Sequence, residues 1–286
     1  MTLGISLFYF CRIWFPFYSF DIVYNEGGNE LIVTVWGKEK RMEEVRALCR
    51  KEHICIPFDE LSEFDLSKLD AVILPLQSIQ GEKGNYMDRR QIEYPLFFWE
   101  CLREDCKIIA GKETTFLKQL SLSKAYYLKD EAFLNENARL TAQGALFYIL
   151  DLADRSLDEY KVDIIGKGHC GTAIGKLLKL LGMNVRYVRH GEAKNEDECT
   201  YEQWKKTPGA DFVIPCAPCS MLDKNMISLW PRTTCVIDIS GAEKGLEELL
   251  IDQGIRYVRA ANLPEIFTPR SSGQAIYAFA RRILNE

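Results

Sequence analysis

The hydrophobic and polar positions of this chain form short apolar runs that alternate with longer segments of helical spacing. Apolar runs predict strands over residues 31–36, 54–57, 70–75, 107–110, 125–128, 161–165, 183–188, 211–215, 235–239 and 255–258. Helical spacing is found over residues 42–49, 97–101, 131–150, 172–181, 201–204, 221–230, 246–253 and 273–284. Alternating strands and helices are typical of parallel sheets with helices on their faces. We therefore predict an α/β fold of two doubly wound, Rossmann-like parallel-sheet domains with a cleft between them.

The same pattern divides the chain into four segments. Residues 1–28 form an apolar extension, and residues 29–130 form a flavodoxin-like or Rossmann-like domain that we expect to bind substrate. Residues 131–160 carry a helix that joins the two halves, and residues 161–286 form the dinucleotide-binding domain.

A glycine-rich turn lies between the first strand and the first helix of the second half. Its residues are Gly166, Lys167, Gly168, His169, Cys170 and Gly171, which give the pattern Gly-x-Gly-x-x-Gly. The first glycine permits a sharp turn, the second leaves room for a pyrophosphate, and the third lets the helix pack near the strand. The helix N-terminus presents free N–H groups to the phosphates. We predict that these six residues contact a dinucleotide; a turn that binds nothing is the alternative.

The end of the next strand bears on which cofactor binds. Proteins that bind NAD usually carry Asp or Glu there, about 20 residues after the glycines, to hold the ribose 2′-OH. This chain has Arg189 and His190 at that place, and the first acid is Glu192. A cation suits a 2′-phosphate, so the sequence favours NADP and leaves NAD open. The alternative is that Arg189 is only a solvated strand end.

Two further strand ends are predicted to line the cofactor. Cys216, Ala217 and Pro218 follow the strand over residues 211–215, and Asp238 lies at the end of the next one. Cys216 and Cys219 also have the spacing of a redox or zinc motif. A second cysteine pair at metal spacing is missing, which argues against zinc. A thioredoxin-like dithiol is the remaining alternative.

Three groups of residues are candidates for binding a substrate with carboxylates. Asn137 and Thr141 lie between the predicted domains, where substrate would meet nicotinamide, although both also suit helix capping. Arg270, Ser271 and Ser272 open the last helix and combine a cation with hydroxyls and free N–H groups. An ordinary N-cap is the alternative there.

The third group lies in a polar loop over residues 77–91, at the carboxyl end of a strand. Open α/β sheets bind their ligands at such ends. Arg89, with Arg90 beside it, is our candidate for a second carboxylate contact, and a solvated loop charge is the alternative.

Composition limits the class of protein. A length of 286 residues suffices for two domains, and 47% hydrophobic with 27% charged residues is a globular composition. A net charge of −5 without a dominant basic patch argues against nucleic-acid binding. Ten irregularly spaced cysteines are typical of reduced thiols, which points to the cytoplasm.

Residues 1–20 do not fit this globular pattern, because they are apolar and aromatic with Arg12 as their only basic charge. Pro16 interrupts the run, and the length is at the low limit for a membrane span. Three interpretations remain open. The segment is a weak membrane anchor, a strand-like extension that packs on the folded domains, or extra sequence that results from a wrongly placed start codon. The charge and the proline both weaken the membrane interpretation.

Four segments resemble the dipicolinate synthase family, and specifically its A subunits. Residues 137–145 resemble its Asn…Thr-Ala-Glu-Gly-Ala segment, and residues 164–171 its Leu-Gly-Phe-Gly-Arg-Thr-Gly turn. Residues 236–240 resemble its Ile-Ile-Asp-Leu-Ala-Ser strand. Residues 263–274 resemble its Leu-Pro-Gly-Lys-Val-Ala-Pro-Lys-Thr-Ala-Gly-Gln run, which is the most specific of the four. The resemblance extends over roughly residues 31–286.

The resemblance implies a function. The family makes pyridine-2,6-dicarboxylate in spore-forming bacteria from a product of the lysine pathway, together with a flavoprotein-like B subunit. Its A subunit resembles a nicotinamide-dependent dehydrogenase. By this resemblance the chain is an NAD(P)-dependent oxidoreductase that oxidises a dihydro- or hydroxytetrahydro-dipicolinate. The expected partners are this small dicarboxylate, a B subunit and, as an open possibility, further copies of the chain.

The chain also departs from the family pattern. His169 and Cys170 replace Arg-Thr in the turn, and Glu265-Ile266 replaces the Gly-Lys that follows Leu-Pro. The 2-hydroxyacid dehydrogenases share the two-domain plan and use a His with an acidic partner, a pair that is not evident here, so no catalytic base is assigned. A non-catalytic nucleotide-binding partner protein or sensor, or a different dehydrogenase, are the alternatives.

Overall fold

The computed structural model describes residues 30–76, 98–207, 209–217, 222, 224–241 and 245–286, together with the backbone of residues 79–80, 85–86 and 97. Residues 1–28, Arg89, Arg90, Pro218 and Cys219 therefore lie outside the described part of the chain. No helix among the described residues is long and apolar enough to cross a membrane.

The first sheet consists of five parallel strands in the order β2-β1-β3-β6-β7. Its strands are β1 (Ile32–Val35), β2 (Ile54–Ile56), β3 (Ala71–Ile73), β6 (Lys107–Ala110) and β7 (Ser123–Tyr126). The accompanying helices are α1 (Lys40–Cys49), α2 (Phe97–Glu100) and α3 (Thr115–Gln119). Short 3-10 helices cover Phe58–Glu60, Leu66–Lys68 and Tyr127–Lys129. This strand order is that of flavodoxin-like sheets, which place their ligands at the carboxyl ends of the strands.

The loop predicted over residues 77–91 contains a small hairpin. Strands β4 (Ile79–Gln80) and β5 (Asn85–Tyr86) pair antiparallel there. Strands of two residues carry no periodicity, so the sequence pattern does not reveal them.

The second sheet consists of six parallel strands in the order β10-β9-β8-β11-β12-β13. Its strands are β8 (Lys161–Ile165), β9 (Asn184–Arg189), β10 (Glu198–Thr200), β11 (Phe212–Pro215), β12 (Cys235–Asp238) and β13 (Arg256–Arg259). A 3-10 helix over Leu157–Glu159 precedes it, and its helices are α5 (His169–Leu180), α6 (Tyr201–Trp204), α7 (Lys224–Ile227) and α8 (Leu246–Asp252). This is the strand order of dinucleotide-binding Rossmann sheets. The predicted α/β fold with two parallel sheets is confirmed.

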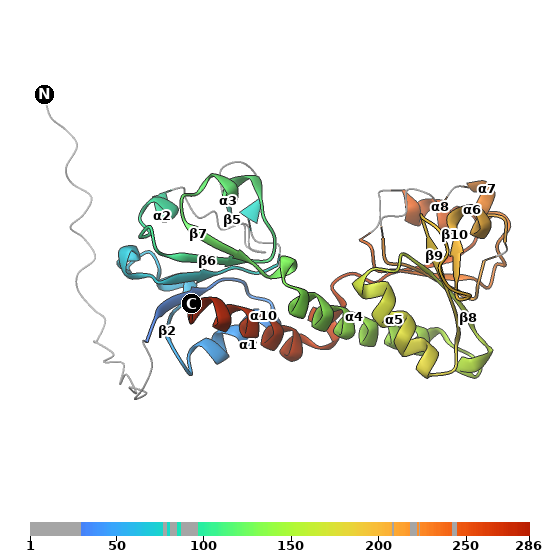
Figure 1. Ribbon diagram of the computed structural model, residues 1–286, viewed down its shortest axis with the longest axis horizontal. Helices are drawn as coiled ribbons and strands as arrows, with labels where there is room; N and C mark the ends of the chain where they lie inside the picture. The colour runs from blue at the N-terminus through green and yellow to red at the C-terminus, as the bar shows by residue number, and fades with distance from the viewer. Residues whose placement is uncertain are drawn as a thin grey trace, which may run out of the picture.

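Helix α4 (Glu131–Leu152) joins the two sheets without a break (Figure 1). Asp130 caps it, because its side chain accepts a hydrogen bond from Phe133 N at 2.8 Å. Asn137 and Thr141 lie inside the helix, where the Thr141 hydroxyl donates to Asn137 O at 2.8 Å. The alternative interpretation of these two residues as a helix cap was therefore wrong, since a cap lies where N–H groups lack helical partners.

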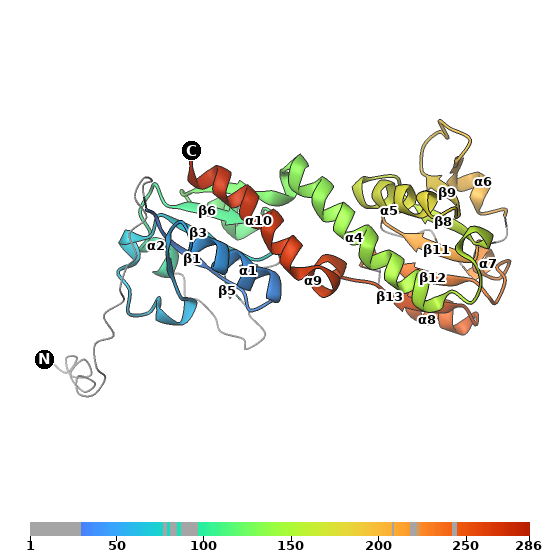
Figure 2. The ribbon, with the colours of Figure 1, turned by 90° about the horizontal axis from the view of Figure 1, so that it is seen from below.

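The chain returns from the second sheet through α9 (Leu263–Phe267) and α10 (Pro269–Leu284). Helix α9 packs closely on α4, since a Cβ at Gly144 would lie 2.7 Å from Leu263 Cβ. Helix α10 then runs beside α1 (Figures 1 and 2). Its apolar residues Ile276, Phe279 and Leu284 share one hydrophobic core with strands of the first sheet.

The position of α10 corrects the division predicted from the sequence. Chain order placed all of residues 161–286 in the dinucleotide-binding domain, but the last helix packs in the first sheet's core. The physical reason is its amphipathic face, which is buried against α1 and β1 rather than against the second sheet. The helix also starts at Pro269, four residues before the predicted start, because proline is favoured in a first helical turn.

Candidate cofactor site

The glycine turn between β8 and α5 has the backbone geometry that the sequence suggests. Gly166 has φ of +97°, a conformation that side chains with a Cβ rarely adopt. A Cβ at Gly171 would lie 2.0 Å from the backbone oxygen of Gly166, so only glycine permits the helix to start this close to the strand. At Gly168 a Cβ would meet nothing within 4 Å. The turn is thus closed on the helix side and open above its middle glycine.

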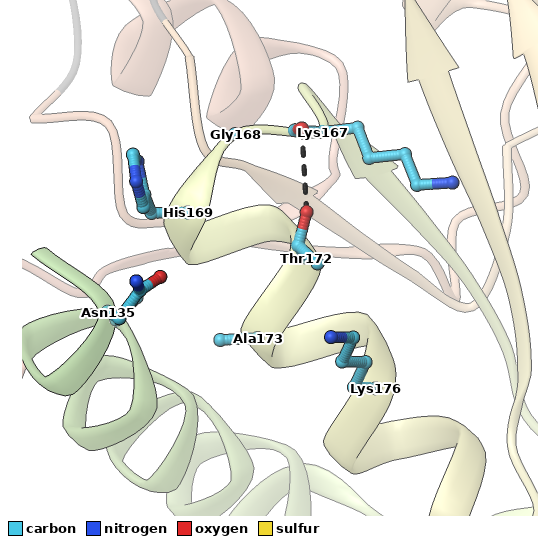
Figure 3. A pocket seen from close by; sticks show the side chains of 8 residues that line it. Asn135, Lys167, Gly168, His169, Thr172, Ala173 and Lys176 are labelled. Carbon is cyan, nitrogen blue, oxygen red and sulfur yellow. Dashed lines mark hydrogen bonds between the residues drawn. The ribbon is translucent and has the colours of Figure 1, made fainter. Parts of the chain in front are cut away.

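A cavity of about 480 Å³ opens beside this turn. It is lined by Asn135 and Ala138 of α4 and by Lys167, Gly168, His169, Thr172, Ala173 and Lys176 of the turn and α5. Figure 3 shows Asn135 on α4 facing His169 and α5, with Thr172 directed back to the turn. The Thr172 hydroxyl donates to Lys167 O at 3.5 Å. The open face of the turn and the cavity therefore form one continuous space.

Two lysines border this cavity beside the apolar Ala138 and Ala173. The positive charges of Lys167 and Lys176 favour anionic groups such as phosphates. His169 Nε2 lies 2.9 Å from Glu131 Oε1, so the first residue of α5 is linked to the first residue of α4. His169 does have an acidic partner, which the sequence alone did not reveal, but the pair lies at the phosphate turn.

Cys170 and Thr141 meet where α4 packs on α5. Burial raises the pKa of the Cys170 thiol, and a hydrogen bond with Thr141 partly opposes this. Thr141 is buried, and its hydroxyl already donates to Asn137 O. Both residues therefore lie in the helix interface beside the turn. Asn137 is half-buried.

Arg189 is the last residue of β9, and His190 follows it at the surface. Arg189 Nη1 donates to Glu198 Oε2 at 2.8 Å, and the Arg189 side chain keeps 29% of its exposure. Glu198 was not among the predicted site residues. It lies in β10, a strand of three residues that only its pairing with β9 defines.

The other predicted cofactor residues lie at the carboxyl ends of β11 and β12. Ala217 is next to the glycine turn, because a Cβ on Gly166 would lie 3.0 Å from Ala217 Cβ. Cys216, which precedes Ala217 in the chain, is half-buried, and Pro218 lies outside the described residues. Asp238 is fully buried and accepts hydrogen bonds from Ser240 Oγ at 2.7 Å and Tyr257 OH at 2.9 Å. Burial above all, and then this hydrogen bond, raise the pKa of Tyr257.

The predicted carboxylate clamp lies at the start of α10, against the first sheet's α1. Arg270 is 81% exposed and lies 3.5 Å from Glu44 Oε1, whereas Ser271 is half-buried and Ser272 is buried. A Cβ on Gly273 would lie 2.4 Å from Arg41 O, so the first turns of α1 and α10 touch. Arg89, the other predicted contact, lies outside the described residues.

Arg41 is a second residue that sequence reasoning missed. Its side chain is 8% exposed, and its Nη2 lies 3.4 Å from both Glu39 Oε1 and Glu265 Oε2. Its Nε is buried without a hydrogen-bond partner among the described residues. The sequence signal that could have identified Arg41 was its place at the start of the helix that follows the first strand. The acid that pairs with Arg41 from α9 is Glu265, one of the residues at which the chain departs from the family pattern.

Comparison with known proteins gives two curated relatives, whereas no family model matches the chain. The chain is 21% identical over 286 residues to the A subunit of dipicolinate synthase from Bacillus subtilis, covering 89% of this chain and 96% of that protein. It is 33% identical over 81 residues to erythronate-4-phosphate dehydrogenase of Idiomarina loihiensis, which covers 27% of this chain and 21% of that protein.

Solved structures agree on the fold. The A subunit of dipicolinate synthase from Bacillus halodurans superposes with a TM-score of 0.76 at 18% identity, covering 90% of this chain and 98% of that one. NAD⁺-bound 3-phosphoglycerate dehydrogenase of Entamoeba histolytica gives a TM-score of 0.56 at 13% identity, with coverage of 90% and 95%. The chain is thus a homologue of the dipicolinate synthase A subunit with the two-sheet fold of D-2-hydroxyacid dehydrogenases, as its motifs predicted.

Proposed function

We propose that this chain is a nicotinamide-nucleotide-dependent oxidoreductase similar to the A subunit of dipicolinate synthase. It would oxidise a dihydro- or hydroxytetrahydro-dipicolinate to dipicolinate in the cytoplasm during spore formation. The observation that carries the proposal is the glycine turn, closed by Gly171 against Gly166 O and open above Gly168. It lies on the central strand of a sheet with the dinucleotide-binding order.

The residues of the turn fit a dinucleotide. The open space at Gly168 admits a pyrophosphate, and the free N–H groups at the start of α5 face an anion there. Lys176 adds positive charge at the adjoining cavity, while Ala217 closes the neighbouring side of the turn. Arg189 stands where a 2′-phosphate is held in related sheets, which supports NADP as the preferred cofactor. When bound, the oxidised nicotinamide supplies hydride acceptance.

The substrate would lie toward the first sheet. The N-terminal turns of α1 and α10 meet there, with Arg41 and Arg270 at their starts. Guanidinium groups and helix N-termini both favour carboxylates. Ser271 adds a hydroxyl, and Asn137 on α4 would face the same region. Formation of the aromatic ring is favourable, so orientation of the substrate is the main task of these residues.

A turnover assay tests this proposal. The full chain is mixed with dihydrodipicolinate and either NADP or NAD, and reduced nicotinamide and dipicolinate are measured in parallel. Equal amounts of the two products are expected. Nucleotide binding without any turnover would contradict the enzymatic role.

A second function is that of a nucleotide-binding protein that acts only with a partner. One observation favours it: Arg270 is exposed and pairs with Glu44, so the carboxylate clamp is not assembled in the described residues. Here we infer a partner of the flavoprotein-like B type. Turnover that appears only after addition of that partner would support this role over the first.

A further inference from the structure

A buried carboxylate lies beneath the cofactor site. Glu198 in β10 pairs in register with Tyr187 of β9, and its side chain is only 1% exposed. A carboxylate removed from water to this degree is stable only when hydrogen bonds and opposite charges compensate its lost hydration.

Four donors compensate Glu198. Lys167 Nζ and Asn195 Nδ2 donate to Oε1 at 2.6 and 3.0 Å. Arg189 Nη1 and the backbone N of Lys194 donate to Oε2 at 2.8 and 2.9 Å. The Lys167 ammonium, followed by the Arg189 guanidinium, holds the pKa of Glu198 far below its usual range. Both oxygens are thus occupied by hydrogen bonds, and these contacts favour the ionised form of Glu198.

Two of these donors belong to the candidate cofactor site. Lys167 lies in the glycine turn after β8, and Arg189 ends β9. Glu198 of β10 therefore links the glycine turn after β8 to the end of β9. Lys167 Nζ also lies 4.5 Å from the centre of the Tyr187 ring, which fixes its path over β9.

A second acidic residue, Asp197, lies beside this network. Lys179 forms an ion pair with Asp197, whose Oδ1 also lies 4.0 Å from Lys167 Nζ. Lys167 and Arg189 share the single charge of Glu198. The single charge of Glu198 therefore balances only one of the two cations that contact it.

Arg189 is held by one of its nitrogens only. Nη1 binds Glu198, and no described residue accepts a hydrogen bond from Nε or Nη2. These two nitrogens form one edge of the planar guanidinium group, and that edge matches two oxygens of a phosphate. The 29% exposure of the Arg189 side chain leaves room for such a contact.

We propose that Glu198 is a positioning residue for cofactor selection. It fixes Arg189 through Nη1 so that the Nε–Nη2 edge faces the 2′-phosphate of NADP. This inference rests on the proposed cofactor binding. The opposite role, in which Glu198 neutralises Arg189 and favours NAD, requires an acceptor open to the ribose hydroxyls. Glu198 is buried and fully bonded, so it offers none.

The test is a calorimetric titration of NADP and NAD into the full-length wild type, Glu198→Gln, Arg189→Ala and the double variant. Arg189→Ala should raise the Kd of NADP about 10- to 50-fold through loss of a charged bidentate contact. Glu198→Gln should raise it about tenfold. In both, the Kd of NAD should change less than about threefold. In the double variant the two losses should not add, because Glu198 acts through Arg189.

Glu202→Gln is the matched control, because Glu202 is 69% exposed on the adjacent α6. It should leave both affinities unchanged. Arg189→Lys is a second probe that keeps the charge and loses the two-nitrogen edge. It should weaken NADP binding nearly as much as Arg189→Ala does. It also tests the proposed contact if Glu198→Gln does not fold.

The possible outcomes separate the two hypotheses. Tighter NADP binding by Glu198→Gln, equal weakening of both nucleotides, or additive losses in the double variant would each overturn the positioning role. Full NADP affinity in Arg189→Lys would overturn the two-nitrogen contact. If the wild type binds neither nucleotide, the proposed function itself fails.

Discussion

The two sheets of this protein build their carboxyl edges in different ways. At the second sheet, one continuous stretch from β8 through the glycine turn into α5 supplies most of the candidate contacts. At the first sheet, the corresponding region is assembled by helices from opposite ends of the chain. Gln274 of α10 and Glu44 of α1 are 230 residues apart and lie 3.3 Å from each other. A local motif therefore identifies one site, whereas the other exists only in the folded molecule.

The largest expected effect distinguishes two glycines of the same turn. Gly171→Ala should destabilise the protein by about 3 kcal/mol or more, because its Cβ would overlap the backbone oxygen of Gly166. Gly168→Ala should change stability by less than about 1 kcal/mol, because its Cβ points into open space. Urea unfolding of both variants measures this. Similar losses in the two would contradict the described turn.

The second prediction concerns which sheet α10 stabilises. Ile276→Ala should cost about 2–5 kcal/mol, because Ile276 is fully buried in the core that contains Val33 and Val45. Native-state hydrogen exchange should show weakened protection in β1 and β3, with β8 and β11 less affected. Loss of protection confined to the second sheet would instead support the predicted assignment of the last helix to the dinucleotide-binding domain.

The third prediction uses pH to separate the buried carboxylate from the exposed ones. The folded-state pKa of Glu198 is lowered, so its contribution to stability is present above the unfolded pKa of about 4.3 and is lost as pH falls below it. Wild type should therefore lose more stability between about pH 5 and pH 3 than Glu198→Gln does. Urea unfolding across this range measures the difference, and parallel pH profiles would argue against an ionised Glu198.

The smallest effect on stability is expected at the first sheet's edge. Arg270→Ala should change stability by less than about 0.5 kcal/mol, because an 81% exposed arginine in a loose ion pair contributes little. It should nevertheless raise the KM for the dicarboxylate about tenfold if Arg270 binds a carboxylate. Steady-state kinetics with Arg282→Ala as an exposed α10 control tests this. An unchanged KM would remove Arg270 from the site.

Much of the architecture could be predicted from the sequence. The strand at Cys235–Asp238 and the helix at Tyr201–Trp204 follow directly from apolar runs and helical spacing. The short strand β10 and helix α9 were missed, because β10 has three residues and α9 begins after Asn262, which has φ of +56°. Such elements are defined by their neighbours rather than by local pattern.

The candidate site likewise contains residues that the local sequence pattern identifies and residues that it does not. The turn from Gly166 to Gly171 could be located because each glycine meets a local backbone requirement. The link from Lys167 to Glu198 spans 31 residues, and that from Arg41 to Glu265 joins the start of α1 to α9. Pairings of this kind depend on how strands order in a sheet and how helices return to it, which residue spacing does not encode.

The central claim is that the space above Gly168 receives a dinucleotide. The most direct test is calorimetric titration of NADP into wild type and Gly168→Leu, with Ala47→Leu on the exposed face of α1 as control. We predict saturable binding by wild type and control, and none by Gly168→Leu at unchanged thermal stability. Equal binding by all three proteins, or binding by none, would contradict the account.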